Sequence, residues 1–120
     1  MTRQDTSSLD RRSEIPDDLL RLEFARTGAE ETLYATGELD VSTAPALEHA
    51  AARMLDGQGG EFHLDVRGMT FMDSTGAQAL VRLHRRFTDL GRRLVIVSPT
   101  HQVRMVLEIL GLDQVLDVRP

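Results

Sequence analysis

The segment Asp73-Ser74-Thr75-Gly76 combines residue types that suit a modification site at the start of a helix. It lies between an apolar segment and a strongly periodic one, so the pattern predicts a strand-to-helix junction. Asp73 or Ser74 would cap that helix by accepting hydrogen bonds from the free amides of its first turn. A phosphate on Ser74 would lie at the positive end of the helix dipole, where backbone N–H groups favour an anion.

Phosphorylation at this junction would change the surface of the protein rather than its fold. A phosphate adds about −1.5 to −2 charge and three acceptor oxygens. Beside Asp73, that charge would repel an acidic partner surface and would be costly to bury against an apolar one. The residues alone leave two alternatives open. Thr75 could be the acceptor instead, and an Asp or Ser before a helix also serves as a plain cap.

A nucleophilic role for Ser74 is a competing interpretation. The nucleophile elbow of many hydrolases has the pattern G-x-S-x-G. Gly76 fits this pattern, but Met72 stands where the first glycine should be. The sequence also shows no base for the serine. We therefore expect a protein that is not an enzyme. The alternative is a small hydrolase that uses Ser74, and a panel of ester substrates would test it.

The other residue types argue against metal and cofactor chemistry. The chain has no cysteine, which excludes disulfides and thiolate zinc sites. The histidines are His49, His63, His84 and His101, and no pair has the spacing of an HExxH site. Lysine is absent and there is no glycine-rich P-loop, so nucleotide hydrolysis has no visible apparatus. We expect no metal and no cofactor.

Charge and hydropathy favour a cytoplasmic protein. A net charge of −5 is a poor match to the basic surfaces that bind nucleic acid. No apolar run approaches the roughly 18 residues of a membrane helix. The polar N-terminus, with charges of both signs, fits neither a secretory nor a transit signal. We expect no direct contact with nucleic acid and no membrane contact.

The hydrophobic pattern predicts five strands and three helices. Alternating apolar residues indicate strands, and a continuous apolar run indicates a central strand covered on both faces. The predicted strands lie at residues 20–25, 33–39, 62–66, 94–97 and 115–118. Apolar residues at helical spacing predict helices that begin near Thr43, Asp73 and Ser98 and that end at Gly57, Gly91 and Gly111. Two of the apolar stripes end at Leu90 and Leu110.

The predicted order β-β-α-β-α-β-α-β indicates an α/β fold. A short turn through Gly28 favours an antiparallel hairpin at the start. Strand–helix–strand units favour parallel pairing, so we expect a mixed sheet with helices mainly on one face. Residues 1–18 are rich in polar groups and poor in apolar ones, and we expect a flexible N-terminal tail. Residues 19–120 then form one domain.

Taken together, these features resemble the STAS domain of anti-sigma factor antagonists. The resemblance covers about residues 19–118 and depends on several short segments in the right order. These are Gly37-Glu38-Leu39-Asp40, Thr43-Ala44, Thr70-Phe71-Met72-Asp73-Ser74-Thr75-Gly76, Gly91, the apolar strand at 94–97, Ser98-Pro99 and Ile109-Leu110-Gly111-Leu112.

The resemblance implies a partner-switching regulator. In such proteins the serine after the Asp, here Ser74, is phosphorylated by an anti-sigma factor that is also a GHKL-type serine kinase. The unphosphorylated form binds that anti-sigma factor and frees the sigma factor, and a PP2C-type phosphatase resets the cycle. The resemblance places the partner surface around the phosphoserine and the loop after the second strand. On this chain those positions are Asp40, Ser42, Thr43, Met72, Asp73, Thr75 and Gly76.

Two further points stay open from the sequence. Phe71 and Met72 would suit apolar contact with a partner if they are exposed, whereas burial under the sheet is an equal alternative for Phe71. A STAS domain can also act in another assembly, as a scaffold in a stressosome-like particle or as a regulatory subunit associated with a transporter.

Overall fold

The computed structural model describes residues 19–57 and 59–120, and the predicted tail, residues 1–18, lies outside the described residues. Strands and helices alternate along most of the chain. In order they are β1 (Leu20–Thr27), β2 (Glu30–Leu39), α1 (Ala44–Ala52), β3 (Glu61–Asp65), β4 (Met69–Met72), α2 (Ser74–Asp89), β5 (Arg93–Val97), α3 (His101–Ile109), a 3₁₀ helix η2 (Leu112–Gln114) and β6 (Asp117–Arg119).

The strands form a six-stranded mixed sheet with the order β1-β2-β3-β5-β6, and β4 pairs with β2. As predicted, β1 and β2 form an antiparallel hairpin, while the other strand pairs are parallel. Gly37 of β2 pairs with Leu20 of β1 and with Met69 of β4. These two neighbours therefore occupy opposite edges of β2. The carboxyl ends of β2 and β4 lie side by side, with Leu39 opposite Met72.

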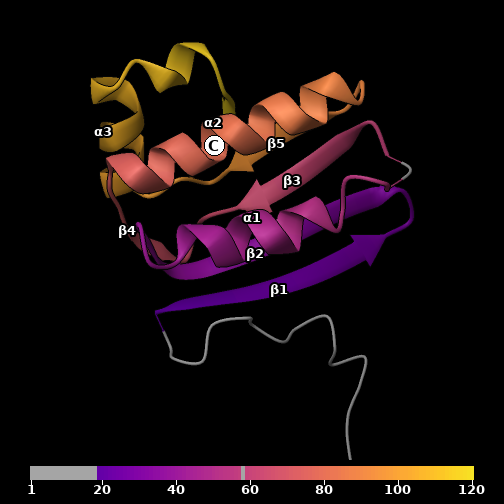
Figure 1. The fold of residues 1–120 in the computed structure, drawn as a ribbon, viewed down its shortest axis with the longest axis horizontal. Helices are drawn as coiled ribbons and strands as arrows, with labels where there is room; N and C mark the ends of the chain where they lie inside the picture. The colour runs from indigo at the N-terminus through magenta and orange to yellow at the C-terminus, as the bar shows by residue number, and fades with distance from the viewer. Residues whose placement is uncertain (1–18, 58) are drawn as a thin grey trace, which may run out of the picture.

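Helices α1 and α2 cover one face of the sheet, and α3 packs beside β4 at one end (Figure 1). The core lies between this helical layer and the sheet. Phe62 of β3 and Phe87 of α2 are fully buried there, and their rings stack with centroids 4.9 Å apart. The predicted α/β fold with helices mainly on one face is confirmed.

One strand was not predicted. Residues 69–72 were expected to connect a strand to a helix, but they form β4 because the far half of β2 extends beyond β3 and offers them a free edge. Leu33 pairs with β3, whereas Leu39 pairs with β4. A segment of four residues has too short an apolar pattern to be distinguished from a loop.

The predicted element ends also need correction. Helix α1 ends at Ala52 rather than at Gly57, and the chain continues in tight turns whose carbonyls at Met54 and Leu55 accept hydrogen bonds from Arg92. Leu90 and Leu110 follow the last residues of α2 and α3, so both are exposed rather than part of the buried stripes. The final strand begins after the turn η2, at Asp117 rather than at Val115.

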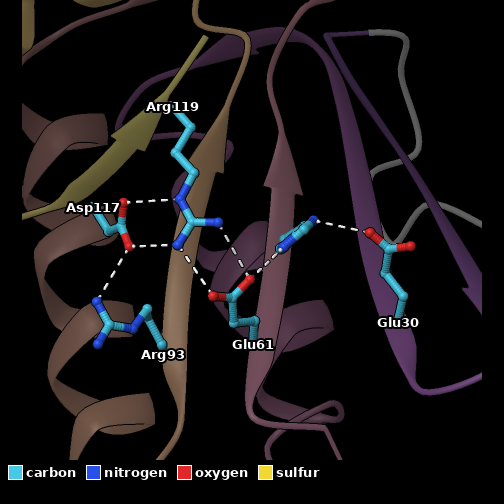
Figure 2. A network of polar contacts seen from close by, with 6 residues as sticks. Glu30, Glu61, Arg93, Asp117 and Arg119 are labelled. Carbon is cyan, nitrogen blue, oxygen red and sulfur yellow. Dashed lines mark hydrogen bonds and ion pairs between the residues drawn. The ribbon is translucent and has the colours of Figure 1, made fainter.

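A chain of ion pairs crosses the sheet on the face opposite the helices (Figure 2). Glu61 and His63 point to this face because they alternate with the buried residues of β3. The Arg119 guanidinium of β6 lies 3.1 Å from a Glu61 oxygen and 3.1 Å from an Asp117 oxygen. His63 lies 3.0 Å from Glu61 and 3.5 Å from Glu30. The network thus links β2, β3 and β6 across the intervening strand β5.

Candidate functional site

Two polar loops meet at the carboxyl ends of β2 and β4, where α1 and α2 also begin (Figure 1). The Asp73 amide donates a hydrogen bond of 3.3 Å to the Leu39 carbonyl, which joins the two loops directly. Gly76 is buried against the same carbonyl, and a Cβ at this position would lie only 2.5 Å from the Leu39 oxygen. Glycine is therefore required for the first turn of α2 to pack on the end of β2.

Asp73 is the N-cap of α2, as one of the two sequence alternatives predicted. Its backbone is extended, and its Oδ1 accepts a hydrogen bond of 3.0 Å from the Gly76 amide. Ser74 is then the first residue of the helix and is exposed. Within residues 19–57 and 59–120, its hydroxyl has no hydrogen-bond partner, so it is free to be modified. The Thr75 side chain is half-buried.

The loop after β2 is shaped by Asp40. Its Oδ1 accepts from the Ser42 hydroxyl at 2.8 Å, from the Ser42 amide at 3.0 Å and from the Thr43 amide at 3.2 Å. The hydrogen bond from the Ser42 hydroxyl is the main reason that the pKa of the Asp40 carboxyl lies below its usual value. Thr43 closes the loop, accepting from the Asp40 amide and donating to the Glu38 carbonyl. The loop therefore presents a fixed carboxylate near Ser74.

Comparison with known families decides the class of the protein. The family described as "Mlab, STAS domain" matches residues 22–118. The chain belongs to the STAS domain family. An anti-sigma-B factor antagonist from Staphylococcus epidermidis is 28% identical over 82 residues, which cover 68% of this chain and 76% of the relative.

Solved structures of antagonists share the fold of this STAS domain. An anti-sigma factor antagonist from Mycobacterium paratuberculosis superimposes with a TM-score of 0.76 at 22% identity, covering 88% of this chain and 89% of that one. The phosphorylated form of the Bacillus cell fate determinant SpoIIAA gives a TM-score of 0.61 at 20% identity, covering 82% and 89% of the two chains. The predicted family is confirmed.

The structure changes the role of three residues predicted to contact a partner. Met72 is fully buried because it faces the core from the last position of β4. Thr43 is 1% exposed, since its hydroxyl is used inside the loop. Gly76 is buried against Leu39. The Met72 and Thr43 side chains are therefore not at the surface, and all three residues shape the site from beneath.

The remaining predicted residues lie on an accessible surface that also has apolar groups. Val41 is 71% exposed in the loop after β2, and Phe71 is 41% exposed on β4, so the sequence alternative of a buried Phe71 is wrong. We call this area the Ser74 surface. Its members are exposed or half-buried residues of the two loops: Asp40, Val41, Ser42, Asp73, Ser74 and Thr75. The exposed Phe71 precedes this surface on β4.

Val41 was not predicted from the sequence, although its position in a polar turn could have indicated it. Val41 stands between Asp40 and Ser42 in a polar turn, where neither the strand before it nor the helix after it requires an apolar residue. An apolar side chain held in solvent by a rigid turn is suited to contact with another protein. Phe71 is also an exposed apolar residue, although it lies on the strand β4 rather than in a turn.

The described residues show no arrangement for catalysis or for metal binding at Ser74. None of the hydrogen bonds made by residues 19–57 and 59–120 joins a histidine or a carboxylate to its hydroxyl, as a serine nucleophile with a general base would require. In the same residues, no three His, Asp or Glu side chains form a group that could hold a metal ion. No helix among them is long and apolar enough to span a bilayer.

A pocket of about 820 Å³ lies at the other end of the molecule from Ser74. It is bordered by the C-terminal part of α2, at His84 and Thr88, and by the first residues of β3, β5 and β6. The charged groups at its edge, Glu61, Arg93 and Asp117, take part in the ion-pair network across the sheet. Each of these three charges already has an ion-pair partner, since Glu61 pairs with Arg119 and Asp117 pairs with Arg93 and Arg119.

Proposed function

We propose that this STAS domain is an anti-sigma factor antagonist switched by phosphorylation of Ser74. Its unphosphorylated form binds an anti-sigma factor with GHKL-type serine kinase activity and thereby releases the sigma factor. Phosphorylation of Ser74 abolishes this binding, and a PP2C-type phosphatase restores it. The names of the relatives support an anti-sigma factor as the partner. The switch itself is supported by the geometry of Ser74.

The observation on which this proposal depends is the position of the Ser74 hydroxyl. It is exposed, has no hydrogen-bond partner among the described residues, and belongs to the first turn of a helix that is already capped by Asp73. Since the cap does not depend on Ser74, a kinase can phosphorylate the hydroxyl without breaking a hydrogen bond among the described residues. The SpoIIAA neighbour, which has the same fold, exists in a phosphorylated form.

The surroundings of Ser74 explain how a phosphate would control binding. The Asp40 and Asp73 carboxylates already lie on the Ser74 surface, and a phosphate would add about −1.5 to −2 charge beside them. A partner that packs on the exposed Val41 and Phe71 would then have to bury this charge or face it. Both are unfavourable, whereas the helix start accepts the anion.

Intact mass spectrometry after incubation with ATP and candidate anti-sigma kinases from the same genome tests this proposal. We expect the gain of one phosphate in the wild-type protein and in a Thr75→Ala control, and no gain in Ser74→Ala. Ser74→Ala should still bind the anti-sigma factor, and Ser74→Asp should bind at least about tenfold more weakly. Equal binding by the wild type, Ser74→Ala and Ser74→Asp would contradict the switch. Large particles on a sizing column, without kinase binding, would instead support a stressosome-like scaffold.

A further inference from the structure

The outer edge of β4 is closed by side chains of α3 instead of by another strand. One edge of β4 pairs with β2. On the other edge, the Thr100 hydroxyl donates a hydrogen bond of 3.1 Å to the Met69 carbonyl. Thr100 is also the N-cap of α3, where its oxygen accepts from the Val103 amide. The first turn of α3 therefore starts at a fixed place beside β4.

Gln102 completes this edge by pairing with both backbone groups of Met72. The Met72 amide donates to Gln102 Oε1 at 2.9 Å, and Gln102 Nε2 donates to the Met72 carbonyl at 3.0 Å. The two bonds fix the orientation of the side-chain amide, because a flipped amide would place donor against donor and acceptor against acceptor. One side chain thus takes the place of a neighbouring strand at the last residue before Asp73.

We infer that Gln102 is a positioning residue for the Ser74 segment. Met72 is held by Gln102 on one side, and the next residue, Asp73, is held by its hydrogen bond to the Leu39 carbonyl on the other. Asp73 then caps α2, and Ser74 follows directly. Gln102 therefore fixes the position of the last residue of β4, and with it the position of Ser74 two residues later. The link to phosphorylation rests on the proposed function above.

The support for Gln102 comes from the packing of α3. Val103 and Leu107 are buried against the core, so the helix that presents the amide is itself held in place. Gln102 is half-buried, and water cannot replace both of its bonds to Met72 without entering the gap between α3 and β4. Loss of the amide should therefore loosen residues 72–76 locally and leave the rest of the sheet in place.

Hydrogen exchange of backbone amides, measured by NMR, tests the positioning role directly. In Gln102→Leu we expect the Met72 amide to exchange at least about tenfold faster, while the Leu64 and Ile96 amides keep their rates. Gln114→Leu is the matched control, because Gln114 is exposed and its side chain bonds only to the adjacent Asp113 among the described residues. An unchanged Met72 amide in Gln102→Leu would overturn the inference.

A second variant separates positioning from a general loss of structure. Gln102→Glu keeps an acceptor for the Met72 amide and loses the donor to the Met72 carbonyl, so we expect the exchange rate of Met72 to lie between those of the wild type and Gln102→Leu. The rate of Ser74 phosphorylation and the affinity for the anti-sigma factor should follow the same order, measured at a temperature well below the unfolding midpoint of every variant. Faster Met72 exchange without any effect on phosphorylation or binding would overturn the role of Gln102 in the site.

The failure of this inference can be distinguished from the failure of the proposed function. If the wild-type protein is neither phosphorylated nor bound by any anti-sigma factor, the proposed function fails, whatever Gln102 does. The exchange rates of the wild type, Gln102→Leu and Gln102→Glu then decide by themselves whether Gln102 positions residues 72–76. If the wild type is phosphorylated and the Gln102 variants match it in every measurement, the proposed function stands and the positioning role is rejected.

Discussion

At the scale of single residues, the site separates the group that can be modified from the groups that hold the helix start. Asp73 caps α2 through the Gly76 amide, and the Ser74 hydroxyl makes no hydrogen bond within the part of the chain that the structure describes. This division lets the hydroxyl change its chemistry while the helix keeps its cap. A serine that was itself the cap would have to exchange its capping hydroxyl for a phosphate oxygen, so the same modification would act on the helix start as well as on binding.

Replacing the cap should therefore cost stability even though Asp73 is at the surface. We expect Asp73→Ala to lower the free energy of unfolding by about 1 kcal/mol, because the Gly76 amide loses its acceptor. Asp89→Ala is the control at the other end of α2, where a negative charge opposes the helix dipole, and it should be neutral or slightly stabilising. Urea unfolding followed by circular dichroism measures both, and an equal loss in the two variants would argue against the cap.

At the scale of elements, the far ends of α1, β2 and α2 are joined by one buried arginine. Arg92 is 8% exposed and lies 2.7 Å from the Glu31 carboxylate, which is 1% exposed. The same guanidinium donates to the Gly59 carbonyl at 2.7 Å and to the Met54 carbonyl at 2.6 Å. Burial alone would raise the pKa of Glu31, but hydrogen bonds from Arg92 and Arg26 outweigh it, so the pKa is lowered.

Removing this arginine should be among the most damaging single changes in the chain. Arg92→Met leaves the Glu31 carboxylate buried with Arg26 as its remaining partner. It also removes a donor from three carbonyls, of which the Met54 carbonyl still accepts from the Gly57 amide. We expect a loss of about 3–5 kcal/mol in the free energy of unfolding. Arg93→Met is the matched control, since Arg93 is exposed and its side chain bonds, among the described residues, only to Asp117 at 3.3 Å. This variant should lose less than about 1 kcal/mol. Similar losses in the two variants would show that the buried Arg92–Glu31 pair contributes no more stability than an exposed ion pair.

The elements also show what could and could not be predicted from the sequence. The hairpin, the helical layer and a helix cap at Asp73 or Ser74 followed from local patterns, because alternation and capping act over a few residues. β4 could not be predicted, since its four residues form a strand only because β2 extends beyond β3. The burial of Met72 and Thr43 and the pairing of Gln102 with Met72 depend on the same long-range arrangement.

At the scale of the whole molecule, one end of the sheet and the face opposite the helices have different roles. The carboxyl ends of β2 and β4 form the Ser74 surface, and the face opposite the helices is tied together by the network around Arg119 (Figure 2). The hydrogen bond from His63 and then that from Arg119 lower the pKa of Glu61 to about 2. Because the pKa of Glu61 is lower in the folded state than in the unfolded chain, ionised Glu61 stabilises the fold above its unfolded pKa of about 4.3.

The stability that Glu61 contributes should therefore disappear on acidification. We expect the difference in free energy of unfolding between the wild type and Glu61→Gln to be constant above about pH 5 and to shrink as the pH falls toward about 2. Urea unfolding at a series of pH values measures this difference. Glu108→Gln is the control, since Glu108 is exposed on α3 and has no ion-pair partner in the described part of the chain. A difference that does not change with pH would contradict the role of the network.

On the proposed function, a phosphate on Ser74 switches binding without unfolding the domain. The most direct measurement is the affinity of the unphosphorylated and the fully phosphorylated protein for the cognate anti-sigma factor, by titration calorimetry, with the thermal unfolding of both forms recorded alongside. We predict that the phosphorylated form binds at least about a hundredfold more weakly and unfolds at nearly the same temperature. Equal affinities, or a phosphorylated form that is already unfolded, would contradict this account.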